Sequence, residues 1–186
     1  MGPWSIPLPR RHYLRLDIGP LLLPELLHTT AGAKRLLLDL KAVDSGPSEA
    51  FATALAREIE AAGAREWVAV CGQFWPVLDR VREVAPEIKV RYSMQAASQW
   101  GEYVRRLDQG EVTLAVCMQH RMMDANRMAF LRANSVDVYC WTVDRAEEAR
   151  QLMEIGVEGV ISNDLALLAG LRDGAGEAGA QPPVEG

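Results

Sequence analysis

Six short apolar runs alternate with segments of helical composition along most of this chain. The runs are five to eight residues long and are bounded by Gly, Pro or charged residues, which is typical of buried strands. The intervening segments are rich in Ala, Leu, Glu and Arg, residues that favour helices. The predicted strands are 35–41, 67–71, 88–92, 112–118, 136–143 and 156–161, and the predicted helices are 21–31, 49–62, 76–84, 98–107, 124–133, 145–155 and 165–171.

Strands that alternate with helices form βαβ units, which build a parallel sheet with right-handed crossovers. A doubly wound open sheet and a (β/α)₈ barrel both satisfy this pattern. The phosphate-binding signatures GxGxxG and GxxxxGK[ST] follow none of the strands, which disfavours the nucleotide-binding open sheets. We therefore expect an α/β fold: a partial (β/α)₈ TIM-type barrel with about six parallel strands. A complete barrel needs about 250 residues, whereas this chain has 186.

The composition divides the chain into three parts. Residues 1–20 are rich in Pro and Arg without a clear period, so we expect an irregular segment. Residues 21–172 hold the alternating pattern and form the predicted, incomplete barrel domain. Residues 173–186 consist mainly of Gly, Ala, Glu and Pro, which predicts a disordered tail.

Charge and cysteine content exclude several classes of protein. The net charge is −5 and the basic residues are scattered, so the sequence predicts no nucleic-acid partner. No apolar run reaches the roughly 18 residues of a membrane helix, so we expect no integral membrane segment. Cys71, Cys117 and Cys140 lie singly in apolar runs, which indicates buried thiols and a reducing, cytoplasmic location.

Three stretches resemble one enzyme family. Leu36–Lys41 reads Leu-Leu-Leu-Asp-Leu-Lys and resembles a barrel strand that ends Glu-Ile-Lys. Val68–Phe74 resembles a strand that ends Ser-Phe. The most specific stretch begins at Val136, with Trp-Thr-Val-Asp at residues 141–144 against a family Trp-Thr-Val-Asn, and continues with Gly-Val-Glu-Gly-Val-Ile-Ser at 156–162 against Gly-Val-Asp-Gly-Ile-Ile-Thr-Asp.

That family is the glycerophosphodiester phosphodiesterases, and the likeness covers most of residues 21–172. It implies that the chain corresponds to the third through eighth strands of the family barrel. The family's His-Arg-Gly, Pro-Glu-Asn-Thr and His-Asp motifs have no counterpart upstream of Leu36. Asp39 replaces the family Glu, and Asn163 replaces the family Asp. A misassigned start, a degenerate paralogue and an expressed fragment all fit these departures.

The resemblance implies metal-dependent hydrolysis of a glycerophosphodiester to an alcohol and glycerol 3-phosphate, with Ca²⁺ or Mg²⁺. Carried over residue by residue, it makes Asp39 the metal ligand, Lys41 the catalytic cation that faces the phosphate, and Trp141 a wall of the substrate pocket. Asp39 and Lys41 are two apart on a strand and therefore face one side. Because one carboxylate holds a metal weakly and no histidine matches an acid/base position, we expect weak or no activity from this chain alone.

Each of these residues also has a structural interpretation. Asp39 could pair with Lys41 or an arginine, since buried acids are usually paired, and Trp141 could be core. His120 could line the barrel mouth, although we favour a solvated loop position. We expect Asn163 and Asp164 to cap the last helix.

Two other functions remain open. The first is a non-catalytic partial-barrel scaffold or dimerising protein, because an incomplete barrel exposes two sheet edges that a second copy could cover as a homo-oligomer. The second is an unrelated phosphate-binding barrel fragment or open α/β sheet, which a strand order that is not sequential would favour.

Overall fold

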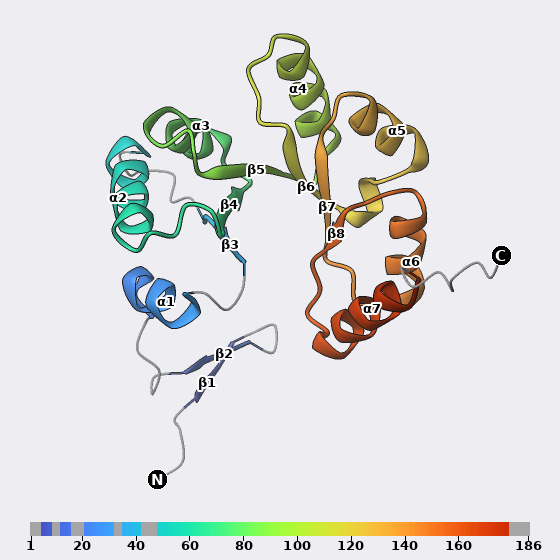
Figure 1. Cartoon of the computed structure of the whole chain (residues 1–186), viewed down its shortest axis with the longest axis horizontal. Coiled ribbons are helices and arrows are strands. Elements are labelled where there is room, and N and C mark those ends of the chain that lie inside the picture. Colours follow the sequence, from blue (N-terminus) through green and yellow to red (C-terminus); the bar gives the residue numbers. More distant parts are fainter. Residues whose placement is uncertain (1–4, 9–11, 16–20, 32–34, 42–47, 179–186) are drawn as a thin grey trace, which may run out of the picture.

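The computed structural model describes residues 5–8, 12–15, 21–31, 35–41 and 48–178. Its main feature is a six-stranded parallel sheet in the sequential order β3-β4-β5-β6-β7-β8. The strands curl into an arc with the helices along its outer side (Figure 1). The strands are β3 Leu36–Asp39, β4 Val68–Gly72, β5 Lys89–Met94, β6 Ala115–Gln119, β7 Asp137–Trp141 and β8 Gly159–Val160.

A helix follows each strand of this parallel sheet, as the alternating pattern predicts. Sequential order of all six strands confirms the partial-barrel prediction and disfavours the open doubly wound sheet. The helices are α1 Leu23–Thr30, α2 Ser48–Ala61, α3 Trp75–Val84, α4 Ala97–Asp108, α5 Ala125–Ala133, α6 Ala146–Glu154 and α7 Leu165–Ala178, with a 3₁₀ turn η1 at His120–Met122.

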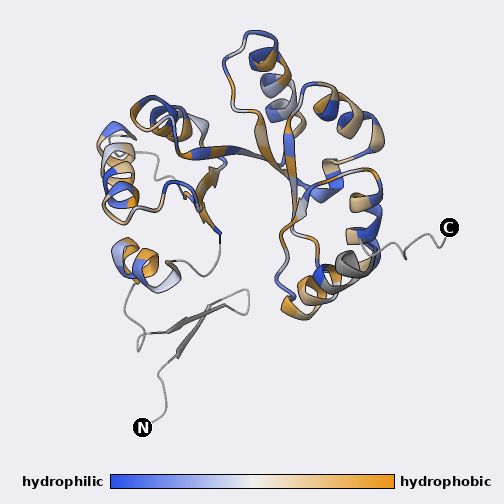
Figure 2. Cartoon of the chain, in the orientation of Figure 1, coloured by the Kyte–Doolittle hydropathy of each residue, from blue (hydrophilic) through white to orange (hydrophobic). Residues whose placement is uncertain are grey.

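The main core lies between the outer face of the sheet and the helices. Hydrophobic residues alternate with hydrophilic ones along strands such as β5, and the helices show both hydrophobic and hydrophilic turns (Figure 2). Trp75 of α3 stacks on Tyr92 of β5 with ring centroids 4.7 Å apart, and Tyr103 of α4 meets both rings edge-on. Tyr92 and Tyr103 are fully buried, so this aromatic cluster fixes two helices onto the sheet.

Side-chain caps begin two of the helices. Asp124 Oδ1 accepts a hydrogen bond from the backbone N–H of Arg127 at 2.8 Å, and Asp164 Oδ1 accepts from Ala166 N at 2.9 Å and Leu167 N at 3.0 Å. These bonds satisfy backbone donors that have no partner inside the helix. The capping role expected of Asp164 is therefore present, whereas Asn163 bonds to Asp144 instead.

The two ends of the chain differ from the sequence-based expectation. Within residues 1–20, expected to be irregular, β1 Ser5–Leu8 and β2 His12–Arg15 pair antiparallel; Ile6 and Tyr13 are residue types enriched in strands. Helix α7 continues to Ala178, six residues into the segment expected to be disordered, although Gly174 and Gly176 disfavour helix. Residues 179–186 lie outside the described residues.

Strand β3 also differs from expectation, since it is half-buried rather than buried. It stands first in the sheet and pairs with β4 alone among the described strands, so one of its edges lacks the cover that central strands have. In the part of the chain that the structure describes, no helix has the length and apolar character needed to span a membrane.

Candidate functional site at the carboxyl edge of the sheet

The strand register places Asp39 and Trp141 on the same face of the sheet. Residues paired between neighbouring parallel strands point to one face, and so do alternate residues along a strand. The face opposite the buried aromatic cluster is the inner, concave one. The pairs that connect the two residues along it are Asp39 with Cys71, Cys71 with Arg91, Ser93 with Cys117, and Gln119 with Trp141.

Both residues also lie at the same edge. Asp39 is the last residue of β3 and Trp141 is the last residue of β7. The strands are parallel, so both stand at carboxyl ends, the edge at which (β/α) barrels build their active sites. Lys41 follows two residues after Asp39. The three residues therefore lie on one face and at one edge of the sheet. Asp39 on β3 and Trp141 on β7 are four strands apart.

Lys41 and Asp39 form an ion pair. Lys41 Nζ lies 2.5 Å from Asp39 Oδ2, and the side chains are 79% and 51% exposed. Asp39 therefore pairs with Lys41, as the structural interpretation predicts. It is exposed, however, whereas that interpretation expects a buried acid. A pair this open to solvent contributes little to stability, so these two charges are available to a ligand.

The Trp141 side chain is half-buried and is fixed by one hydrogen bond. Its indole Nε1 donates a hydrogen bond to the backbone O of Cys117, 3.0 Å away on the neighbouring strand β6. This bond satisfies the indole donor while leaving part of the ring accessible. Trp141 is therefore neither a fully buried core residue nor a freely moving surface side chain.

Two buried thiols lie on the concave face below this edge. Cys71 is 4% exposed and Cys117 is fully buried. A hydrogen bond with the Cys117 thiol lowers the pKa of Cys71, and among the smaller effects the charge of Asp39 raises it and that of Lys41 lowers it. The same hydrogen bond and burial raise the pKa of Cys117. Burial of all three cysteines agrees with the sequence-based prediction.

A second polar group follows β6, β7 and β8 at the carboxyl edge. The Asp144 carboxylate accepts hydrogen bonds from the backbone N–H and side-chain amide of Asn163 and from Ser162 Oγ, and these lower the pKa of Asp144. The His120 side chain is only 19% exposed and its Nε2 lies 3.8 Å from Glu148 Oε2. The favoured interpretation of His120 as a solvated loop residue is therefore wrong, because η1 folds it against α6.

The described residues do not fit a resident divalent cation. Such an ion takes several oxygen ligands, yet this part of the chain brings no three His, Cys, Asp or Glu side chains together in a metal-binding group. Asp39 contributes one carboxylate, and its charge is matched by Lys41.

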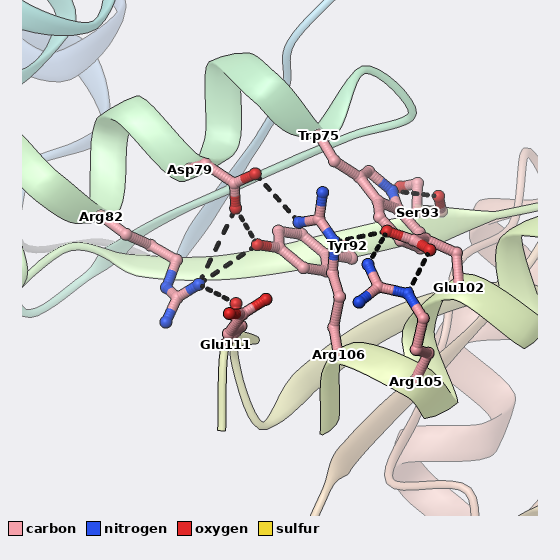
Figure 3. Close-up of polar contacts among 9 residues, drawn as sticks. All are labelled: Trp75, Asp79, Arg82, Tyr92, Ser93, Glu102, Arg105, Arg106 and Glu111. Carbon is pink, nitrogen blue, oxygen red and sulfur yellow. Dashed lines mark hydrogen bonds and ion pairs between the residues drawn. The ribbon is translucent and has the colours of Figure 1, made fainter. Parts of the chain in front are cut away.

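A third polar network lies on the helical side of the sheet, between α3 and α4 (Figure 3). Tyr92 donates a hydrogen bond to Asp79 Oδ1, and Arg106 Nη1 lies 3.0 Å from Asp79 Oδ2. Burial and the bond to Asp79 raise the pKa of Tyr92 to about 12. A cleft of about 610 Å³ borders this network and is lined by Asp79, Arg82, Glu83, Pro86, Arg105, Arg106 and Glu111.

The sequence gives little signal for this network. Glu102 and Arg106 are four apart on one helix, a spacing that predicts their contact, and the Arg106 Nε–Glu102 Oε1 distance is 2.8 Å. Asp79 and Arg106 belong to different helices, and only the fold brings them together. The charges in the cleft are largely paired within the protein, which favours a structural role.

A curled sheet of consecutive parallel strands, with helices outside and exposed polar side chains at the carboxyl edge, defines a (β/α)-barrel protein in partial form. The model of the glycerophosphoryl diester phosphodiesterase family matches residues 57–167, more than half of the chain. The chain belongs to this family. The matched range includes Trp141, whereas Asp39 and Lys41 lie before it.

Relatives support the same assignment. A glycerophosphodiester phosphodiesterase of Arabidopsis thaliana, GDPD4, is 29% identical over 58 residues, which are 31% of this chain and 18% of that protein. A structure from Silicibacter pomeroyi, named as a candidate glycerophosphoryl diester phosphodiesterase, has a TM-score of 0.72 at 21% identity and covers 89% of this chain and 58% of that one.

A phosphodiesterase of Oleispira antarctica, solved with the product sn-glycerol 3-phosphate, has a TM-score of 0.68 at 20% identity. The match covers 81% of this chain and 60% of that one. At such identities the solved structures establish the fold alone. The chain thus spans about three-fifths of the length of these two solved relatives.

Proposed function

We propose that the carboxyl edge of this partial barrel binds the phosphate and glycerol portion of a glycerophosphodiester. Lys41 supplies the positive charge for the phosphate, and Trp141 forms a flat wall for the glycerol or the alcohol group. The observation that carries the proposal is the common face and edge of Asp39, Lys41 and Trp141. Family membership and the glycerol 3-phosphate bound by the Oleispira antarctica structure support the choice of ligand.

The proposed binding does not need Ca²⁺ or Mg²⁺. The family resemblance makes Asp39 a metal ligand, but a single carboxylate paired with Lys41 is a weak site for a hard cation. We propose that Asp39 instead orients the Lys41 ammonium toward the ligand. A lysine presents a compact point charge with three donors, which suits a phosphate oxygen.

We further propose that hydrolysis by this chain is weak or absent. Phosphodiester cleavage needs a group that activates the attack and a group that protonates the leaving alkoxide. Among the described residues, the concave face near Asp39 offers no histidine, and His120 packs against Glu148. The thiols buried on this face indicate a reducing compartment, which supports the proposal of a cytoplasmic location.

Calorimetric titration with sn-glycerol 3-phosphate tests binding directly. We expect saturable binding that is unchanged by excess EDTA and reduced at least tenfold in Lys41→Ala. Lys89→Ala is a matched control, because Lys89 is the same residue type at the opposite, amino end of the sheet, where it pairs with Asp137. Equal losses in both variants, or no binding by the unaltered chain, would refute the proposal.

Hydrolysis is tested separately with glycerophosphocholine, with and without Ca²⁺ or Mg²⁺. We expect no turnover above the uncatalysed background under either condition. Metal-stimulated turnover that Asp39→Asn abolishes would instead restore the metal-ligand role that the resemblance implies for Asp39. A non-catalytic scaffold is the second candidate, and the edge of β3 that no described strand covers favours it.

A further inference from the structure

Strand β3 has a backbone edge, with a defined pattern, that no described strand pairs with. The N–H of Leu36 bonds to Trp67 O at 2.8 Å and that of Leu40 to Cys71 O at 2.7 Å. Backbone groups alternate in direction along a strand, so residues 36, 38 and 40 turn toward β4. Residues 35, 37 and 39 turn their N–H and C=O groups the other way, where no described strand pairs with them.

Apolar side chains surround this edge. An open groove of about 370 Å³ is lined by Leu23, Leu38, Asp39, Leu40, Phe51, Ala54, Leu55 and Glu58. Of the side chains that line this groove, Phe51 is 49% exposed. An uncovered strand edge with apolar surroundings is a template for pairing with another strand.

The sequence of the edge is complementary to itself. Residues 35–39 read Arg-Leu-Leu-Leu-Asp. When two copies run antiparallel about a two-fold axis at Leu37, Arg35 of each copy stands opposite Asp39 of the other, and Leu37 stands opposite Leu37. Directly opposed residues share a face in an antiparallel pair, and opposite charges there attract. Arg35 and Asp39 are both exposed.

We propose that two copies of this chain associate through antiparallel pairing of their β3 edges, centred on Leu37. The residues that turn outward are 35, 37 and 39, and in this register each of them opposes another outward residue. Such pairs exchange both backbone hydrogen bonds. The interface is isologous, as a two-fold dimer requires.

Charge selects this register over its neighbours. Outward backbone groups meet whether the axis passes through an outward or an inward residue, since opposed residues then have the same parity. An axis at Arg35 opposes two arginines, and an axis at Asp39 opposes two aspartates. An axis at Leu38 opposes Arg35 to Lys41, and an axis at Leu36 opposes Arg35 to Leu37. Among axes at residues 35–39, the axis at Leu37 alone opposes Arg35 to Asp39, so charge favours this register.

Charge reversal tests the pairing by sedimentation equilibrium of the whole chain. We expect a concentration-dependent dimer, with a dimer Kd raised about tenfold or more in Arg35→Asp and in Asp39→Arg, since each change turns two symmetric attractions into repulsions. The double variant Arg35→Asp/Asp39→Arg exchanges the charges and should restore the dimer. A monomeric unaltered chain, or a dimer indifferent to the single reversals, would overturn the proposal.

A crosslink tests the position of the axis. In Leu37→Cys the new thiols of the two copies stand opposite each other, with Cα atoms about 5.5 Å apart as in hydrogen-bonded antiparallel pairs, within reach of a disulfide. Mild oxidation should give a covalent dimer. Leu36→Cys is the matched control, because residue 36 opposes residue 38 and should not crosslink. The native thiols are buried, so equal crosslinking of both variants would contradict the proposed register.

Discussion

Asp144 and Asn163 hold the carboxyl ends of β7 and β8 together. The Asp144 carboxylate accepts one hydrogen bond from the backbone N–H of Asn163 at 2.8 Å and another from its side-chain amide at 3.0 Å. The family pattern noted from the sequence has Asn at the first position and Asp at the second. The two residues that differ from the family pattern are therefore in contact. Compared with the family pattern, the amide and the carboxylate have swapped positions.

Asp144→Asn should lower the stability of the chain at neutral pH, because a neutral amide accepts the Asn163 and Ser162 donors less strongly. These bonds lower the pKa of Asp144 below its ordinary value of 3.8. A lowered pKa gives stability that is present above the unfolded-state pKa and lost as pH falls through the folded-state pKa. The difference in urea midpoint between the two proteins should accordingly shrink below about pH 3.8.

The double variant Asp144→Asn/Asn163→Asp supplies the control, since it rebuilds the pair in the opposite sense. We expect it to be more stable than Asp144→Asn alone. If the stability losses of Asp144→Asn and Asn163→Asp simply add in the double variant, the contact between the two residues does not contribute to stability.

Tyr92→Phe should cost about 1–2 kcal/mol in unfolding free energy, because it removes the hydroxyl that bonds to Asp79 while leaving the ring stack intact. Burial and Asp79 raise the pKa of Tyr92 from 10.0 to about 12. That raised value gives stability that is full below pH 10 and lost as pH rises through about 12. The ultraviolet difference titration between the two proteins checks it, and a Tyr92 titration near pH 10 would contradict it.

Arg91→Leu should destabilise the chain by about 2 kcal/mol, less than the 3–5 kcal/mol typical of broken buried pairs. The Arg91 side chain is 3% exposed and its Nη2 lies 2.6 Å from Asp137 Oδ2, but Asp137 is 30% exposed and retains Lys89 as a partner. Arg91 also stacks on the Tyr139 ring, 3.7 Å from its centroid. Urea unfolding measures the loss, and an unchanged midpoint would show that the pair is neutral.

Two glycines should respond to alanine in opposite directions. A Cβ on Gly72 would lie 2.8 Å from Leu40 O, whereas one on Gly101 would have no atom within 4 Å outside its own helix. We expect Gly72→Ala to cost about 1–3 kcal/mol through overpacking, and Gly101→Ala to gain about 0.5–1 kcal/mol as a better helix former. Thermal unfolding of both variants compares the signs, and a neutral Gly72→Ala would argue against tight packing of β3 on β4.

The sequence predicts the strand order well, because apolar runs between helical segments leave few topologies for a parallel sheet. It misjudges β3, whose burial depends on whether a strand covers its far edge rather than on its own leucines. It also misjudges His120, whose contact with Glu148 depends on how η1 meets α6.

Part of the candidate site follows from local spacing and part does not. Asp39 and Lys41 are two apart, so their common face follows from strand geometry. The common face of Asp39 and Trp141 requires the register of four successive strand pairs, which no local pattern encodes. The pairing of Arg91 with Asp137, 46 residues apart, is hidden for the same reason.

The most direct test of the proposed site is the indole N–H resonance of Trp141 in a ¹⁵N NMR spectrum, assigned with Trp141→Phe, during titration with sn-glycerol 3-phosphate. We expect this resonance to shift saturably. The resonance of Trp75 should stay in place, because this side chain lies on the helical side of the sheet, where its indole N–H donates to the backbone O of Ser93. Lys41→Ala should remove the shift. A Trp141 resonance that does not move, or that moves equally without Lys41, would contradict a binding site shared by these residues.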